Sequence, residues 1–157
     1  MADVFTHLDE HGAAHMVDVS GKDVSARTAT AAGRVVVNAE VVRLLRDDAL
    51  PKGDAIAVAR IAGIMAAKRT PDLVPLCHPI ALHGVDVDLL VTDDGVDITA
   101  TVRTADRTGV EMEALTSVSV AALAFIDMVK AVDPAAIVTD VRVLTKTGGK
   151  TGDWSRP

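Results

Sequence analysis

Cys77 and His78, two residues that could do chemistry, stand side by side in the segment Leu73–Pro79. Thiol and imidazole groups serve as nucleophiles and proton carriers near neutral pH, and Pro75 and Pro79 stiffen the backbone around them. A nucleophile and its base usually meet through the fold and not through adjacency in sequence. The pattern therefore favours His78 as a hydrogen-bond donor to a substrate over Cys77 as a nucleophile. A structural role for both, a buried thiol beside a packed histidine, stays open.

A carboxylate and an amine stand three residues apart at Asp127 and Lys130, so on a helix they share one face. As a solvated ion pair they would contribute roughly 0.2–0.5 kcal/mol to stability. They follow the apolar stretch 121–126, however, and partial desolvation can tune such a pair for proton transfer. The structural and the catalytic interpretation are about evenly matched. Glu111 and Glu113 lie at the expected start of the same helix, where capping alone explains one acidic side chain.

The C-terminal part of the chain brings Lys146 and Lys150 next to glycines, in the run KTGGKTG. This run is not a nucleotide-binding P-loop, because Leu144 occupies the place of the first required glycine. Glycines still permit a close backbone approach, and the lysines make an anion site a reasonable expectation. Lys52 and Lys68 flank a predicted helix. Each lysine alone is typical of a solvated cation, but as a set in an acidic protein they suggest a clamp for phosphates.

Capping residues, turns and hydrophobic periodicity predict the elements that must position these side chains. Asn38 and Asp54 can each accept the free amides at a helix start, and Asp93-Asp94-Gly95 is a strong hairpin turn. The expected elements are a strand around Thr28–Val37, helices Ala39–Arg46 and 54–68, a hairpin with strands near 85–89 and 96–102, a helix Glu111–Lys130 and a strand near Ile137–Thr145.

This order of elements predicts an α+β fold. It matches the ferredoxin-like split βαβ pattern, an antiparallel sheet with helices packed on one face. The helix expected at 54–68 is apolar nearly all round, interrupted mainly by Arg60. Such a helix must be covered on every side. In a chain of this size the sheet can cover one side and another subunit the other.

Composition narrows the possible functions. The chain has 157 residues, a net charge of −6 and one cysteine, which indicates a single folded domain without an intrachain disulfide or a multi-cysteine zinc site. The acidity argues against nucleic acid or an anionic membrane as a partner. No secretory signal or stretch long enough to span a bilayer is recognised, so a cytoplasmic protein is the simplest expectation. Residues 1–15 are expected to form a flexible arm, and residues 16–157 the single domain.

Several motifs resemble one known family. In chain order they are MVDVS (16–20), KGD (52–54), AGI (62–64), AKRT (67–70), LCHP (76–79), GVEMEALT (109–116), IDM (126–128) and KTGGK (146–150). Their order and spacing are similar to the cyclic pyranopterin monophosphate synthase family of molybdenum cofactor biosynthesis. The resemblance covers about residues 15–154. Several independent motifs carry it, so it is specific.

The resemblance implies an enzyme, a phosphorus–oxygen lyase. Its substrate would be the small molecule (8S)-3′,8-cyclo-7,8-dihydroguanosine 5′-triphosphate, converted into cyclic pyranopterin monophosphate with release of diphosphate. No redox change occurs in this reaction, so flavin, iron–sulfur and nicotinamide signatures are not expected, and no cofactor or metal-ligating residue is assigned. The family forms a homohexamer, a trimer of dimers with the active site at a dimer interface.

The resemblance also implies residue roles. The general acid/base pair would be Asp127 and Lys130. The assisting residues would be Lys52, His78, Glu111 and Glu113. The substrate would be held by Leu76, Cys77, His78, Met112 and Glu113. The cations facing the triphosphate would be Lys68, Lys146 and Lys150.

A non-catalytic alternative is a ferredoxin-like module that oligomerises and senses a small ligand. It explains the expected fold and the acidity equally well. It leaves Asp127, Lys130 and the set of lysines without a role. Turnover of the cyclic triphosphate would discriminate between the two.

Overall fold

A computed structural model describes residues 6–157 of the chain. Its elements are β1 (Ser25–Val36), α1 (Ala39–Arg46), α2 (Ala55–Ala67), α3 (Thr70–Leu73), β2 (Gly84–Val91), β3 (Gly95–Asp106), α4 (Glu111–Val129), β4 (Ile137–Thr147) and β5 (Trp154–Ser155). Helix starts follow the predicted caps: the side chain of Asn38 accepts from the amide of Val41, and that of Asp54 from the amide of Ala57.

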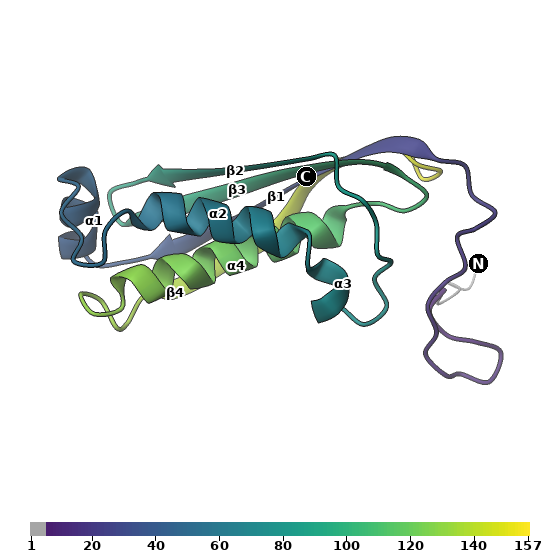
Figure 1. Cartoon of the computed structure of the whole chain (residues 1–157), viewed down its shortest axis with the longest axis horizontal. Helices are drawn as coiled ribbons and strands as arrows, with labels where there is room; N and C mark the ends of the chain where they lie inside the picture. The colour runs from purple at the N-terminus through teal and green to yellow at the C-terminus, as the bar shows by residue number, and fades with distance from the viewer. Residues whose placement is uncertain (1–5) are drawn as a thin grey trace.

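The strands form one antiparallel sheet in the order β2-β3-β1-β4-β5, with α2 and α4 along one face (Figure 1). Without the two-residue β5, the order and the two helical crossovers are those of the ferredoxin-like split βαβ fold. The predicted α+β class and sheet arrangement are therefore confirmed.

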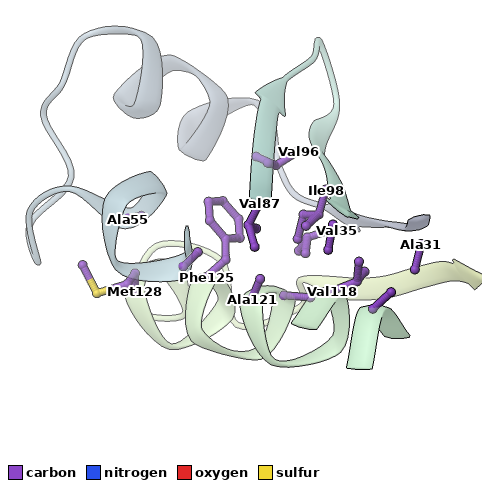
Figure 2. Close-up of a cluster of buried hydrophobic side chains, with 14 of the residues drawn as sticks. Ala31, Val35, Ala55, Val87, Val96, Ile98, Val118, Ala121, Phe125 and Met128 are labelled. Carbon is purple, nitrogen blue, oxygen red and sulfur yellow. The ribbon is translucent and has the colours of Figure 1, made fainter. Parts of the chain in front are cut away.

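The core lies between α4 and the sheet (Figure 2). Phe125 and Val118 of α4, Ile98 of β3 and Val35 of β1 are fully buried. By length and composition alone α4 is apolar enough to cross a membrane. Its packing against β1, β3, β4 and α2 instead marks it as the central helix of a folded domain.

Helices α2 and α4 pack through small residues. A Cβ atom at Gly63 would lie only 3.0 Å from the carbonyl oxygen of Ser117, so glycine permits the close contact. The opposite side of α2 exposes Val58, Ile61 and Met65. The sheet and α4 thus cover one side of this apolar helix, as expected, and the other side is open in the single chain.

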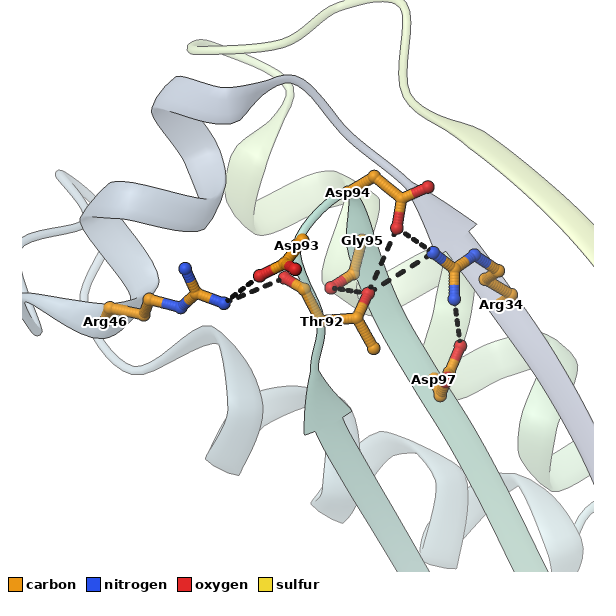
Figure 3. A network of polar contacts seen from close by, with 7 residues as sticks. All are labelled: Arg34, Arg46, Thr92, Asp93, Asp94, Gly95 and Asp97. Atoms are coloured by element: carbon orange, nitrogen blue, oxygen red, sulfur yellow. Dashed lines mark hydrogen bonds and ion pairs between the residues drawn. The ribbon is translucent and has the colours of Figure 1, made fainter.

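A polar network fixes the predicted hairpin turn at the α1 end of the sheet (Figure 3). The guanidinium of Arg34 contacts Asp94 and also Asp97, the latter at 2.6 Å. Arg46 of α1 pairs with Asp93 at 2.8 Å. The turn is thereby held to both β1 and α1.

Several boundaries differ from the predicted ones. Strand β1 begins at Ser25 because its first residues pair with β3, and β4 continues to Thr147 because its last residues pair with β1. Helix α3 and strand β5 were not predicted, and both are too short to carry a periodic pattern. Within the expected N-terminal arm, residues 6–15 form a turn closed by a bridge between Leu8 and Ala14. Residues 1–5 lie outside the described part.

Candidate active site

The first cluster of predicted site residues lines a cavity of about 440 Å³ beside the start of α4. The cavity lies between the loop that follows α3 and the turn from β3 into α4. No side chain caps α4, whose N-cap position is Val110, so amide groups of its first turn are left for other acceptors. The lining residues are Thr6, His7, Val17, Val19, Lys22, Val74, Leu76, Cys77, His78, Thr108, Gly109, Glu111 and Met112.

His78 is anchored by a contact that the sequence did not reveal. Its Nε2 lies 2.6 Å from the carbonyl oxygen of Val17. Because a carbonyl only accepts, Nε2 carries the hydrogen and donates it. This contact fixes the ring orientation and joins the N-terminal segment to the loop after α3. It leaves Nδ1 as the nitrogen available for a ligand.

Glu111 and Lys146 meet across the next part of the site. Lys146 Nζ of β4 lies 3.4 Å from Glu111 Oε1 and 3.0 Å from the hydroxyl of Thr151. Both charged side chains are partly buried, with exposed fractions of 30% and 27%. The pair lines a small cavity of about 60 Å³, which shares Gly109 and Glu111 with the larger one. A carboxylate and a lysine from distant segments are thus brought together.

Lys150 lines a third, open hollow together with Lys22 and Arg27. Lys22 also lines the first cavity and Arg27 the second, so the three hollows share lining residues and are neighbours. Lys68, at the C-terminal end of α2, is exposed. The predicted cations Lys146 and Lys150 therefore lie on one side of the molecule with two cations that sequence reasoning missed.

Cys77, which lines the cavity, contacts the buried Glu113. The thiol of Cys77 donates to Glu113 Oε1 across 3.9 Å. Burial raises the pKa of Glu113 to about 7, and the charge of Glu111 adds to this effect. Burial, followed by Glu113 and Glu111, raises the pKa of the Cys77 thiol. Cys77 is therefore a protonated thiol and a poor nucleophile.

The second cluster comprises Asp127, Lys130 and Lys52. Lys130 Nζ lies 2.6 Å from Asp127 Oδ1, and Lys52 Nζ lies 3.4 Å from Oδ2 and 2.8 Å from the backbone oxygen of Asp127. Hydrogen bonding to Lys130, and then to Lys52, lowers the pKa of Asp127. All three side chains are exposed in the single chain, at 43% to 57%. The carboxylate is thus ionised, flanked by two proton donors and open to a ligand.

The two clusters lie at opposite ends of α4. Glu111 opens the helix, and Asp127 lies in its last turn. Sixteen residues at 1.5 Å each separate them by about 24 Å along the axis. One chain therefore does not bring the predicted residues into a single reacting centre.

Several lining residues had no predicted role, and Val17, Lys22 and Arg27 are three of them. Val17 acts through its backbone, which leaves no side-chain signal. Lys22 follows a glycine and Arg27 directly precedes the strand expected around Thr28–Val37, so neither stood in a motif that predicts an anion site. Across residues 6–157, no group of three or more His, Cys, Asp and Glu side chains is arranged to hold a metal ion.

Fold and site together define a ferredoxin-like α+β protein in which carboxylates, lysines and a histidine surround cavities suited to an anionic small molecule. Residues 16–149 match the model of the MoaC family, and the chain belongs to that family. The resemblance read from the motifs is thereby confirmed.

Curated relatives align over nearly the whole chain. A cyclic pyranopterin monophosphate synthase of Streptomyces coelicolor is 71% identical, covering 98% of this chain and 91% of its own. A protein of the same name from Nocardioides is 72% identical, and the alignment covers 97% of this chain and 95% of that protein. A protein of Mycobacterium tuberculosis named cyclic pyranopterin monophosphate synthase 2 is 62% identical, and the alignment covers 96% of this chain and 90% of that protein.

Proposed function

We propose that this protein is a cyclic pyranopterin monophosphate synthase of molybdenum cofactor biosynthesis. It converts (8S)-3′,8-cyclo-7,8-dihydroguanosine 5′-triphosphate into cyclic pyranopterin monophosphate and diphosphate. The observation that carries the proposal is the identity of about 70% to relatives of that name across nearly the full length of both chains. The non-catalytic sensing module is not favoured, because it gives the Asp127 cluster no role.

Asp127 and Lys130 supply the proton transfers in this proposal. Remodelling a purine into a pterin opens a ring and moves several protons, which calls for a positioned base and a positioned acid. The ionised Asp127 can accept a proton, and the ammonium of Lys130 at 2.6 Å can return one. Lys52 holds the carboxylate from the other side. His78 and Glu111 assist from the first cluster.

The lysines of the first cluster bind the triphosphate. A hydroxyl group attacks the α-phosphorus and gives its proton to a base of the site, the bond to the bridging oxygen of the β-phosphate breaks, and diphosphate leaves. Cations on the non-bridging oxygens stabilise the charge that develops in this step. Lys146 and Lys150 beside the glycines fit this task. Lys68 is assigned to it by the family resemblance alone, since it is exposed at the end of α2 and lines none of these cavities. Leu76, Cys77 and Met112 border the adjoining cavity and hold the rest of the substrate.

The complete active site is shared between chains. A single nucleotide hardly spans the roughly 24 Å between Glu111 and Asp127 on one helix. A second copy that brings its Asp127 cluster to the Glu111 end completes both sites of a symmetric dimer. The exposed Val58, Ile61 and Met65 of α2 supply an apolar surface for assembly. The assembly is a homohexamer built as a trimer of dimers, with each site at a dimer interface.

The proposal also covers the domain that carries the activity, its location and its partners. The domain at residues 16–157 carries the activity without a resident cofactor or metal. The enzyme acts in the cytoplasm on a small molecule, with no nucleic acid or membrane partner.

Turnover of the purified protein with the cyclic triphosphate tests this function. Mass spectrometry of the products should detect cyclic pyranopterin monophosphate and one diphosphate for each substrate consumed. Asp127→Asn, which keeps the shape of the side chain but cannot take up a proton, should give no product above background. Unchanged substrate with the wild-type protein would refute the proposal.

A further inference from the structure

The large cavity beside the start of α4 is bordered on one side by the N-terminal segment of the chain. This part of its lining consists of Thr6, His7, Val17, Val19 and Lys22. All five residues precede β1, so they belong to none of the main strands and helices. The proposed function uses residues of the opposite walls and gives the imidazole of His7 no role. His7 is therefore a polar side chain at the cavity whose purpose is open.

Backbone hydrogen bonds close the segment around His7 into a turn. The amide of His15 donates to the carbonyl oxygen of His7 at 3.0 Å, and the amide of Asp9 donates to that of Ala13 at 2.9 Å. Asp9 Oδ1 also accepts from the amides of His11 and Ala13, at 2.9 and 2.8 Å. Such side-chain contacts to the following amides stabilise turns. The chain thus reverses direction, and His7 lies opposite His15 at the base of the turn.

The chain that follows this turn is fixed to both walls of the cavity. The carbonyl oxygen of Val17 accepts from His78 Nε2 at 2.6 Å, in the loop after α3. The carbonyl oxygen of Lys22 accepts from Arg107 Nε at 2.9 Å, just after β3. The base of the turn lies two residues before Val17, so the first of these anchors also places His7 at the cavity. Its position there follows from defined contacts.

The other polar groups of the lining already have partners within the protein. Glu111 pairs with Lys146, the thiol of Cys77 contacts a carboxylate, and His78 has one ring nitrogen engaged. The hydrogen bonds and ion pairs of residues 6–157 include none with the ring of His7. A neutral imidazole offers one donor and one acceptor. Binding cavities combine apolar walls with a few such polar groups. The ring of His7 is thus suited to a polar group of a ligand.

We propose that His7 contacts the substrate in this cavity, where its imidazole forms a hydrogen bond with the nucleoside part of the bound nucleotide. The inference rests on the proposed function for the identity of the ligand. The nucleoside part is specified because Leu76, Cys77 and Met112 of the same cavity hold that part, whereas the phosphates lie toward Lys146 and Lys150. The N-terminal turn is then one wall of the active site.

Substitution of two histidines on the same turn tests this role by kinetics. His7→Ala should raise KM by about 10-fold, the effect of losing one hydrogen bond, with a smaller change in kcat. His11→Ala is the matched control, because His11 is 81% exposed and does not line the cavity. Its KM should equal that of the wild type. Thermal melts should show that both variants are folded. Equal KM values for the two variants would overturn the inference.

Chemical modification gives a second readout that needs no turnover. Diethyl pyrocarbonate acylates accessible imidazoles, and mass spectrometry of peptides measures its reaction at each histidine separately. GTP, which carries a guanine and a 5′-triphosphate as the substrate does, serves as the probe. It should slow the modification of His7 and leave that of His11 unchanged, because a ligand in the cavity covers only the first.

The two readouts separate this inference from the proposed function. Modification of His7 at the same rate with and without GTP would overturn the inference, even if the wild-type protein turns over the cyclic triphosphate. If the wild-type protein turns over no substrate, the proposed function fails. Protection by GTP then still decides whether His7 faces a ligand in the cavity.

Discussion

Glu111 and Asp127 mark opposite ends of α4, and each meets a lysine from a distant part of the chain. Glu111 pairs with Lys146 of β4, and Asp127 with Lys52 ahead of α2. The same helix thus carries two separate charged clusters, one beside a cavity and one exposed. This division is the reason for our proposal that two chains complete one site together.

Asp127→Ala should lower turnover by about 10²–10⁴-fold, because it removes the proposed general base. The fold should persist, since the side chain is 57% exposed and contributes little to packing. Product formation followed by mass spectrometry and a thermal melt measure the two effects. Asp88→Asn, an exposed carboxylate on β2, serves as a matched control. Near wild-type turnover in Asp127→Ala would remove this residue from the catalytic role.

Helix starts and the hairpin turn could be predicted because the residues that determine them are close together in the sequence. Asn38 and Asp54 each bind an amide three residues ahead, so the starts of α1 and α2 were readable from the sequence. The hairpin turn at Asp93-Asp94-Gly95 was similarly readable. Short elements such as α3 and β5 depend on tertiary contacts and left no periodic signal.

The site was only partly predictable, because some of its contacts join neighbours on one helix and others join distant segments of the chain. The side chains at Asp127 and Lys130 share a helix, so their contact followed from spacing. The contact of Lys52 with Asp127 joins residues 75 positions apart, and that of His78 with Val17 joins residues 61 positions apart. Such contacts are created by the topology of the sheet and helices, which residue types alone do not encode.

Cys77→Ser should retain substantial activity. The reaction needs no covalent intermediate, and the raised pKa of the thiol keeps it protonated. The serine hydroxyl can still donate to Glu113, whereas Cys77→Ala cannot and should be the more impaired variant. A comparison of the activities of the two variants measures how much the contact with Glu113 contributes to turnover. A stoichiometric adduct on Cys77, trapped during turnover, would contradict the expectation.

Lys146→Ala should raise KM for the triphosphate by about 10- to 100-fold, the effect of losing one charge-assisted hydrogen bond. The partner carboxylate Glu111 is left unpaired, so a moderate loss of kcat should follow. Arg43→Gln removes a cation paired with Glu40 on α1 and should leave KM unchanged. Initial rates over a range of substrate concentrations give KM and kcat for the two variants. An unchanged KM in Lys146→Ala would exclude this lysine from phosphate binding.

Gly63→Val should destabilise the fold by about 1–3 kcal/mol through overpacking between α2 and α4. The added side chain would press against the carbonyl of Ser117 and the Cβ atom of Ala121. Gly21→Ala, at a position with open space around it, is the control and should change stability little. Urea denaturation of each variant gives its free energy of unfolding. A Val variant as stable as the wild type would show that the helices can move apart at no cost.

Complementation between two inactive variants tests the shared active site most directly. Glu111→Gln and Asp127→Asn, each expected to be strongly impaired alone, are mixed in equal amounts under subunit exchange, and mixed oligomers are verified by mass. Randomly formed dimers are half mixed, and each mixed dimer keeps one of its two symmetric sites intact, so roughly a quarter of the wild-type activity should return. Mixed oligomers without any recovery, or a fully active wild-type monomer, would contradict the shared site.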